Sequence, residues 1–191
     1  MSKLSDLHRE IKSCESFGLC KTAIQAVPGE GSEEAEVMFI GEAPGKDEDL
    51  QGKPFVGASG KLLTQLIESV GMTREDVYIT NVVKWRPPNN RDPLPEEVEE
   101  QWPFLERQIK IIKPKVIVTL GRHSMGRFLR GLKISQIHGQ LKRASGIWQE
   151  RQIYLPLYHP AVALYDPRKK DTLFDDFKQI PLILKKLNDP S

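Results

Sequence analysis

The chain alternates short apolar runs with segments of helical periodicity, and this alternation constrains its fold more than any other feature. Three apolar runs are typical of buried strands, at residues 37–40, 77–83 and 116–120. A helical pattern over residues 59–70 follows the first run and ends at Gly71. Because strands here alternate with helices, we predict an α/β fold with a central parallel sheet and helices on both of its faces.

The remaining patterns complete this arrangement. Helices are expected over residues 4–14, 95–112, 124–129 and 172–187, and two short strands around Ser145-Gly146 within residues 140–157. Two prolines disturb the helical patterns. Pro103 should kink the second of these helices or divide it into two pieces, and Pro181 should interrupt the last one.

At 191 residues, of which 39% are hydrophobic, the chain is long enough for one sizeable core, and no linker marks a boundary within it. We therefore expect a single domain over residues 1–191, and a monomer. No stretch reaches the roughly 18 apolar residues of a membrane span, and residues 1–6 lack the apolar stretch of a signal peptide, so a cytoplasmic protein is expected. Cys14 and Cys20 are too few for a disulfide scaffold and are expected to be reduced.

The formal net charge is only +2, so the overall charge does not indicate a nucleic-acid partner. The distribution of charge is more informative, because several basic clusters flank the motifs described below. These clusters could form a rim that contacts phosphates, and solvated surface of mixed charge explains each of them equally well. The candidates for phosphate contact are Lys84, Arg86, Arg91 and Arg168.

Three short motifs in or beside expected loops carry most of the chemical information. They are Gly41-Glu42-Ala43-Pro44-Gly45, Pro54-Phe55-Val56-Gly57 and His159-Pro160-Ala161. The first directly follows a strand, so its backbone can approach a flat ligand at the carboxyl end of the sheet, where α/β proteins bind ligands. Asn81, which follows the apolar residues 77–80, completes a set that could hold one heterocycle from several sides.

The order and wording of these motifs resemble the uracil-DNA glycosylase superfamily, and its family 4 in particular. The resemblance rests on residues 41–45, 52–57 and 81–84 with His159, and it extends from about Cys14 to the last helix. It implies a uracil-DNA glycosylase-like fold. It also implies a DNA repair enzyme that hydrolyses the N-glycosidic bond of uracil in DNA and leaves an abasic site. This chemistry needs only protein groups and water, so no cofactor is expected. The alternatives are a glycosylase for another deaminated base and a DNA-binding relative without catalysis.

Two polar side chains would recognise and activate the base. The carboxamide of Asn81 offers an acceptor and two donors, which match N3–H and O4 of uracil, whereas cytosine presents the reverse pattern. In the resembling enzymes, the residue that matches His159 donates a hydrogen bond to uracil O2 as negative charge develops there. Without the resemblance, Asn81 could bond its own turn and His159 could be a structural loop residue.

Phe55 is the candidate that stacks on the base, although a phenylalanine in an apolar triplet is more often part of a core. Glu42 has two interpretations of similar weight: it orients the attacking water, or it accepts backbone N–H bonds and shapes its loop. Gly41, Ala43, Pro44 and Gly45 would line the base from the same side. The acidic residues 47–49 are typical of a solvated turn.

The apolar residues 162–165 resemble the loop that enters the duplex where the base has left, with Ala163 and Leu164 as the candidates. Ordinary packing is the alternative.

The chain departs from family 4 where that family holds an iron-sulfur cluster with four cysteines. Cys14 matches the first ligand, whereas Phe17, Trp85 and Gln101 occupy the other three positions, and Cys20 alone does not restore the set. These side chains cannot replace thiolates, so no metal is expected. We expect the aromatic rings of Phe17, Trp85 and Trp102 to fill the volume instead.

Overall fold

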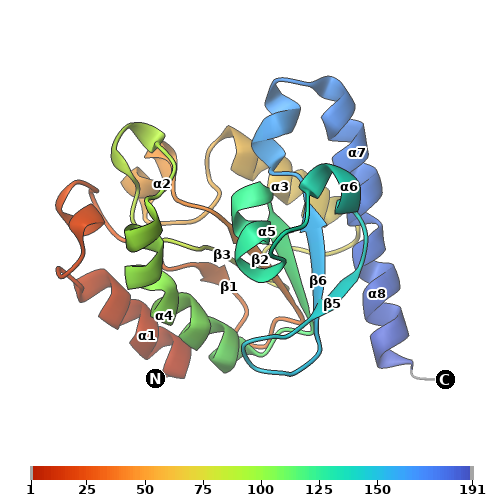
Figure 1. Cartoon of the computed structure of the whole chain (residues 1–191), viewed down its shortest axis with the longest axis horizontal. Helices are drawn as coiled ribbons and strands as arrows, with labels where there is room; N and C mark the ends of the chain where they lie inside the picture. Colours follow the sequence, from red (N-terminus) through yellow and green to blue (C-terminus); the bar gives the residue numbers. More distant parts are fainter. Residues whose placement is uncertain (1, 190–191) are drawn as a thin grey trace.

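A six-stranded sheet in the order β1-β3-β2-β4-β6-β5 forms the centre of the protein (Figure 1). The structure is a computed structural model that describes residues 2–189. The strands are β1 (Glu30–Gly31), β2 (Val37–Gly41), β3 (Tyr78–Asn81), β4 (Val116–Leu120), β5 (Lys142–Ala144) and β6 (Gln152–Leu157). The central strands β3, β2, β4 and β6 are parallel, and β1 and β5 pair antiparallel at the edges. The predicted parallel sheet is therefore confirmed at its centre.

The helices connect these strands and cover them. They are α1 (Lys3–Ser13), α2 (Lys46–Gln51), α3 (Ala58–Ser69), α4 (Pro95–Ile112), α5 (Arg122–Phe128), α6 (Ile134–Ile137), α7 (Pro167–Phe177) and α8 (Gln179–Asn188). Short 3-10 helices span Gly18–Lys21, Pro88–Asn90 and Pro160–Leu164. Within residues 2–189, no helix is both long enough and apolar enough to cross a membrane.

The two prolines affect their helices differently. Helix α4 continues through Pro103, so the predicted division into two pieces is wrong, and the alternative of a kink stays a prediction. Pro103 is exposed, and the carbonyl of Glu99 that loses its helical N–H partner lies on the solvent side, where water can bond it. The last helical segment breaks at Lys178 rather than at Pro181, which occupies the first turn of α8, where its missing N–H has no helical partner.

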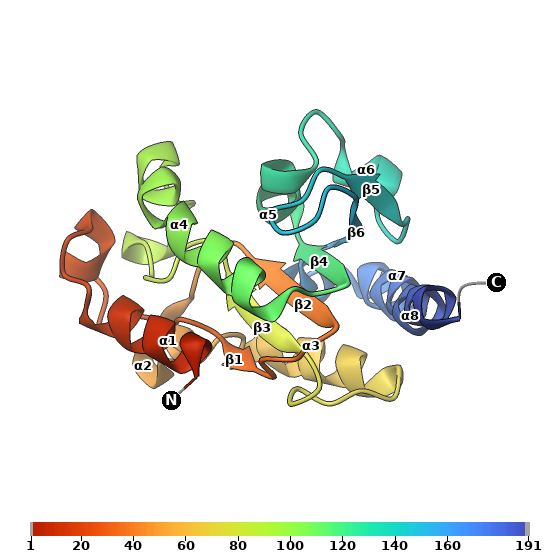
Figure 2. The ribbon, with the colours of Figure 1, turned by 90° about the horizontal axis from the view of Figure 1, so that it is seen from below.

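Helices cover both faces of the sheet, as predicted (Figure 2). Phe39 of β2 points to the face covered by α3, α7 and α8, where its ring stacks on Phe177 with 5.7 Å between centroids. Its neighbour Met38 points to the opposite face and packs with Leu105 of α4 and Met125 of α5. This alternation follows from the two-residue period of a strand, and it gives the sheet an apolar layer on each side.

The carboxyl ends of the four parallel strands meet at one edge of the sheet, and the sequence motifs follow these ends. Strand β2 ends at Gly41 and β3 at Asn81, and the register pairs these two residues directly. Strand β6 leads to His159 through one residue. Segments that are distant in the sequence are therefore brought to one place by the parallel topology.

A third apolar cluster lies between α1, α4 and the segment after β3. Trp85 is 3% exposed there, and the edge of the Phe17 ring meets both Trp85 and Phe104, with 5.8 Å between centroids in each case. Trp102 lies elsewhere, against Phe128, so its predicted place in this cluster is wrong.

The residues of this region do not fit an iron-sulfur cluster. Aromatic rings occupy two of the expected ligand positions and pack against each other. Gln101, at the third, is buried and accepts a hydrogen bond from the backbone N–H of Lys84 at 2.6 Å, so it serves the fold. Packing, and not thiolate ligands, holds the loop that carries Trp85.

We predict that Trp85→Ala lowers the free energy of unfolding by about 3–5 kcal/mol, because it opens a cavity in this cluster. Phe17→Ala should cost less, since Phe17 is only partly buried. Urea unfolding followed by circular dichroism measures both values. Tyr165→Ala is the control, because Tyr165 is 89% exposed and its loss should change the stability by no more than about 0.5 kcal/mol. Full stability of Trp85→Ala would contradict the assignment.

Candidate active site

A cavity of about 440 Å³ opens at the carboxyl edge of the sheet. Its lining includes most of the site residues predicted from the sequence, namely Glu42, Ala43, Pro44, Gly45, Phe55, Asn81, Arg91 and His159. Residues that were not predicted join them, among them Glu48, Ser59, Asn90, Asp92 and Tyr165. The cavity is therefore assembled from loops that follow different strands.

Asn81 lies in the wall of this cavity with 2% of its surface exposed. Its Oδ1 atom is buried and has no hydrogen-bond partner among the described residues. The alternative that Asn81 bonds its own turn is thus not observed for this atom. An unpaired buried acceptor costs about 1–3 kcal/mol, so a ligand that donates a hydrogen bond to Oδ1 would recover that cost.

Gly41 makes room for the side chain of Asn81. A Cβ atom at Gly41 would lie 2.4 Å from Asn81 Oδ1 and 2.6 Å from Cζ of Phe55. Neither neighbour could move away easily, because both are buried. The glycine at the end of β2 therefore permits the amide and the aromatic ring to lie side by side.

The ring of Phe55 forms another part of the wall. Phe55 is 5% exposed, packs into the core below α3, and lies near the imidazole of His159, with 5.6 Å between ring centroids and 29° between planes. Its φ of 51° is in the left-handed region, which costs a non-glycine residue about 1–3 kcal/mol. Both interpretations of Phe55 hold together, since the residue belongs to the core and lines the cavity.

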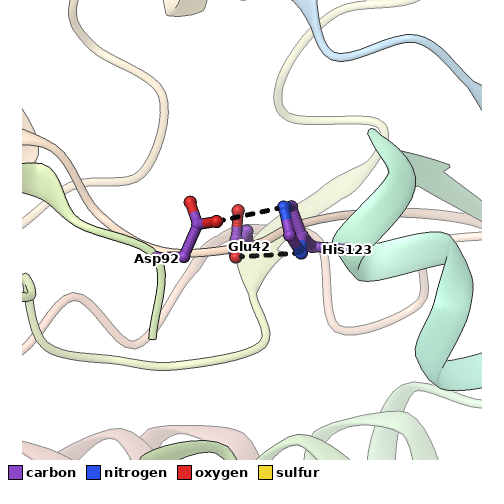
Figure 3. A group of neighbouring side chains, drawn as sticks. All are labelled: Glu42, Asp92 and His123. Carbon is purple, nitrogen blue, oxygen red and sulfur yellow. Dashed lines mark ion pairs between the residues drawn. The ribbon is translucent and has the colours of Figure 1, made fainter. Parts of the chain in front are cut away.

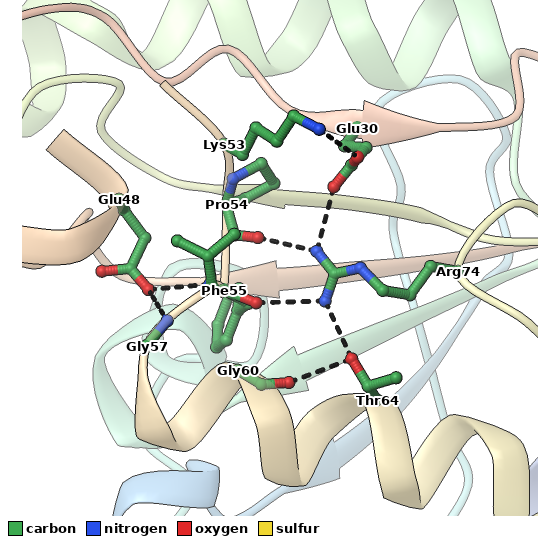
Figure 4. A network of polar contacts seen from close by, with 10 residues as sticks. Glu30, Glu48, Lys53, Pro54, Phe55, Gly57, Gly60, Thr64 and Arg74 are labelled. Atoms are coloured by element: carbon green, nitrogen blue, oxygen red, sulfur yellow. Dashed lines mark hydrogen bonds and ion pairs between the residues drawn. The ribbon is translucent and has the colours of Figure 1, made fainter. Parts of the chain in front are cut away.

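Arg74 holds the strained turn from one side (Figure 4). Its guanidinium donates to the carbonyl of Pro54 at 2.7 Å and to that of Phe55 at 3.1 Å. It also bonds Thr64 of α3 at 3.3 Å and pairs with Glu30 of β1 at 3.1 Å. One planar guanidinium group therefore bonds both carbonyls on either side of the Phe55 backbone.

Glu48 holds the same turn from the other side (Figure 4). Its Oε1 accepts the N–H groups of Val56 and Gly57 at 2.9 and 3.0 Å, and its Oε2 accepts that of Gly45 at 3.1 Å. The prediction of a solvated acidic turn is wrong for Glu48 and for Asp49, which are 9% and 2% exposed. A signal was present, because Glu48 stands at the third position of α2 after Gly45, where a glutamate caps the helix.

His159 is neutral at physiological pH, because desolvation lowers its pKa to about 4. The backbone N–H of Ala161 donates to its Nδ1 at 3.1 Å. Since Nδ1 accepts, the single proton of the neutral ring resides on Nε2. His159 is thus prepared to donate a hydrogen bond from Nε2.

Glu42 forms a charged cluster with His123 and Asp92 (Figure 3). Its Oε1 lies 3.6 Å from Nδ1 of His123, whose Nε2 lies 3.4 Å from Oδ2 of Asp92. Burial raises the pKa of Glu42, and Asp92 adds to this effect, while His123 and Arg122 oppose it. Arg122 donates to Nε2 of His123 at 3.1 Å, so a guanidinium group lies beside the ring.

The loop-shaping role considered for Glu42 belongs to Glu48, whose carboxylate accepts the backbone N–H bonds. The side chain of Glu42 lies partly exposed at the cavity. Sequence reasoning also missed His123, because it lies in a different segment from the motifs and reaches the cluster only through the position of α5.

The prediction that Lys84 contacts phosphates is wrong. Lys84 is completely buried, and its ammonium group bonds three acceptors inside the protein. The segment after β3 turns inward here, because its neighbour Trp85 packs in the apolar cluster. Lys84 therefore lies beneath the cavity wall and not on the rim.

The other predicted basic residues remain at the surface. Arg91 lines the cavity and forms a two-pronged pair with Glu97, at 2.6 and 2.8 Å. Arg86 donates to Asn90 at 2.7 Å and is 24% exposed. The side chain of Arg168 is 92% exposed beside Asp166.

The segment after His159 divides its apolar residues between core and surface. Ala163 packs against the core, whereas Leu164 and Tyr165 are 49% and 89% exposed. Of the two candidates named from the sequence, Leu164 therefore lies on the surface, whereas Ala163 belongs to the packing beneath it. Tyr165 joins Leu164 and also lines the cavity.

A family model described as the uracil DNA glycosylase superfamily matches residues 28–180. A type-4 uracil-DNA glycosylase of Archaeoglobus fulgidus is 50% identical over 186 residues, which cover 94% of this chain and 92% of the relative. Enzymes of the same description from Sulfurisphaera tokodaii and Saccharolobus solfataricus are 48% and 46% identical, over 94% of this chain and 84% and 86% of their own lengths.

We predict that Arg74→Met lowers the free energy of unfolding by about 1–3 kcal/mol, because the partly buried carbonyls of Pro54 and Phe55 lose charged donors. Lys53→Met is the matched control. Lys53 approaches the same Glu30 at 3.8 Å but is 62% exposed, so its loss should change the stability by no more than about 0.5 kcal/mol. Equal effects of the two substitutions in thermal unfolding would show that Arg74 does not hold the turn.

Proposed function

Because this chain belongs to the uracil DNA glycosylase superfamily, we propose that it is a monofunctional uracil-DNA glycosylase. It hydrolyses the bond between C1′ of deoxyribose and N1 of uracil in DNA and leaves an abasic site. The observation that carries this proposal is the unpaired Oδ1 of Asn81 in a cavity whose other walls are Phe55 and a neutral His159. A flat base with a ring N–H and two carbonyl groups complements these three side chains.

Recognition follows from this complementarity. The target nucleotide leaves the stack, because its glycosidic bond is inaccessible inside a duplex. Uracil stacks on Phe55, its N3–H donates to Oδ1 of Asn81, and its O4 accepts from the amide nitrogen. Cytosine has an unprotonated N3, so it would leave Oδ1 buried without a donor.

Bond cleavage requires stabilisation of charge at both ends of the bond. The electron pair of the C1′–N1 bond moves to uracil, and Nε2–H of His159 stabilises the charge that develops on O2. Glu42 orients a water molecule toward C1′ and accepts its proton as the new C1′–O bond forms. The uracil anion takes a proton from solvent after release.

Contacts with DNA follow from the exposed residues around the cavity. Arg86, Arg91 and Arg168 contact phosphates near the extruded nucleotide, and Leu164 with Tyr165 fills the gap that the base leaves in the duplex. The proposal includes a monomer that acts in the cytoplasm, with uracil-containing DNA as its partner.

The test is incubation with oligonucleotides that contain one U, T, C or hypoxanthine, followed by alkaline cleavage at abasic sites. We expect cleavage at U without added metal or nucleotide. Preference for hypoxanthine would support the alternative of another deaminated base. Intact DNA of every kind with enzyme in excess would leave the non-catalytic DNA-binding relative as the better interpretation.

We predict that His159→Ala slows uracil release on the order of 10²–10³-fold, because the substitution removes the donor to O2. Binding of DNA, measured by fluorescence anisotropy, should weaken far less, since the phosphate contacts remain. Parallel losses in rate and binding would assign His159 to the structure of its loop.

The rate should fall as the pH decreases through the pKa of Glu42, because the carboxylate is the active form and burial raises this pKa above its ordinary value. His123→Gln should move this fall to higher pH, since His123 opposes the rise of the Glu42 pKa. Glu42→Gln should release uracil slowly, and its rate should not decrease further as the pH is lowered. Single-turnover rates between pH 4.5 and about 8 measure all three profiles, and superimposable profiles for wild type and His123→Gln would refute the coupling.

A further inference from the structure

The side-chain nitrogen of Lys84 is completely buried and lies directly behind Asn81. Its Nζ donates to the carbonyl oxygen of Asn81 at 2.6 Å, to Oγ1 of Thr80 at 2.7 Å and to Oε1 of Gln108 at 2.7 Å. Lys84 has no exposed surface, and no carboxylate forms an ion pair with it in the part of the chain that the structure describes. A buried charge without a counter-ion is expensive, so its presence calls for an explanation.

The surrounding hydrogen bonds match the protonated form of Lys84. The hydroxyl of Thr80 lies 2.7 Å from the carbonyl of Pro28 and can donate to it, which leaves Oγ1 able to accept from Lys84. The carbonyl of Asn81 and Oε1 of Gln108 are acceptors by nature. Three oxygen atoms therefore face one nitrogen, which matches the three hydrogens of an ammonium group. Burial lowers the pKa of Lys84 well below its ordinary value. Hydrogen bonds to acceptors favour the charged form of an amine and act in the opposite direction.

The network around Lys84 is polar but holds no negative charge that would cancel the cation. Gln108 donates to the hydroxyl of Tyr78 at 2.9 Å, and Nε2 of His8 lies 2.7 Å from the same hydroxyl. Desolvation and the nearby Lys84 lower the pKa of His8 to about 4, which leaves its ring neutral at physiological pH. Of the three residues that accept from Lys84, Asn81 is the one that lines the cavity.

We propose that Lys84 is a positioning residue that stabilises the uracil anion electrostatically through Asn81 as the glycosidic bond breaks. This inference rests on the proposed function and adds a second source of leaving-group stabilisation to His159. The electron pair of the C1′–N1 bond ends on uracil, whose charge spreads over the ring and both carbonyl oxygens. Asn81 lies between this charge and the ammonium group, whose hydrogen bond to the Asn81 carbonyl also fixes the backbone from which the amide projects.

The test compares two leaving groups. Fluorine at C5 withdraws electrons, so the 5-fluorouracil anion needs less help from the enzyme than the uracil anion does. Single-turnover rates are measured for wild type and Lys84→Met on DNA that contains uracil or 5-fluorouracil. We expect Lys84→Met to slow uracil release on the order of 10- to 100-fold, less than loss of a direct donor, and to slow 5-fluorouracil release clearly less. The ratio of the 5-fluorouracil rate to the uracil rate should therefore be higher in Lys84→Met than in wild type.

This ratio distinguishes an electrostatic effect of Lys84 from a loss of folded protein. Misfolding lowers both rates by the same factor, so the fraction of active protein cancels in the ratio. Tyr78→Phe is the matched control, since it removes a buried hydroxyl that accepts from Gln108 but leaves all three acceptors of Lys84 in place. Its ratio should equal that of wild type. If Lys84→Met does not fold, Lys84→Gln allows the same comparison with the same expected rise.

An unchanged ratio in the Lys84 variants would overturn the proposal and assign Lys84 to stability alone. An equal rise in Tyr78→Phe would also overturn it, because the effect would then belong to the network and not to the charge. Failure of the proposed function is distinguishable, since wild type would then release neither base.

Discussion

The pairing of Gly41 with Asn81 across β2 and β3 is the constraint on which the site depends. Parallel strands in this register place the two residues side by side at the carboxyl edge of the sheet. Only a residue without Cβ leaves space there for both the Asn81 amide and the Phe55 ring. The amide, the ring and the loop that are proposed to hold the base all meet at this one pair of residues.

Opposite charges fix the backbone around this pair. Arg74 donates hydrogen bonds to the carbonyl oxygens of the Phe55 turn. Glu48 accepts hydrogen bonds from the N–H groups of the same turn and of the neighbouring loop. Each charged group bonds main-chain atoms that could not satisfy one another in so tight a turn. The site is thereby organised before a ligand arrives, and the left-handed conformation of Phe55 is maintained without a glycine.

Burial also sets the protonation that the chemistry requires. Desolvation keeps His159 neutral, and the N–H of Ala161 selects the tautomer that donates from Nε2. The same effect raises the pKa of Glu42, where His123 and Arg122 limit the rise. In the proposed mechanism, the neutral His159, the carboxylate of Glu42 and the ammonium group of Lys84 each stabilise charge in the same reaction. Burial shifts the pKa of all three groups.

The sequence by itself determined the α/β class, the four central strands, the helices on both faces and the motifs of the site, because hydrophobic periodicity and glycine placement are local properties of the chain. It placed Glu42, Phe55, Asn81 and His159 correctly in one cavity through their positions after strands. Only the tertiary structure decided the roles of Lys84, Glu48, Arg74 and His123. The identity of a charged residue does not reveal whether it lies on the surface or in the core. Its hydrogen-bond partners come from distant segments, so both its burial and its partners depend on the tertiary structure.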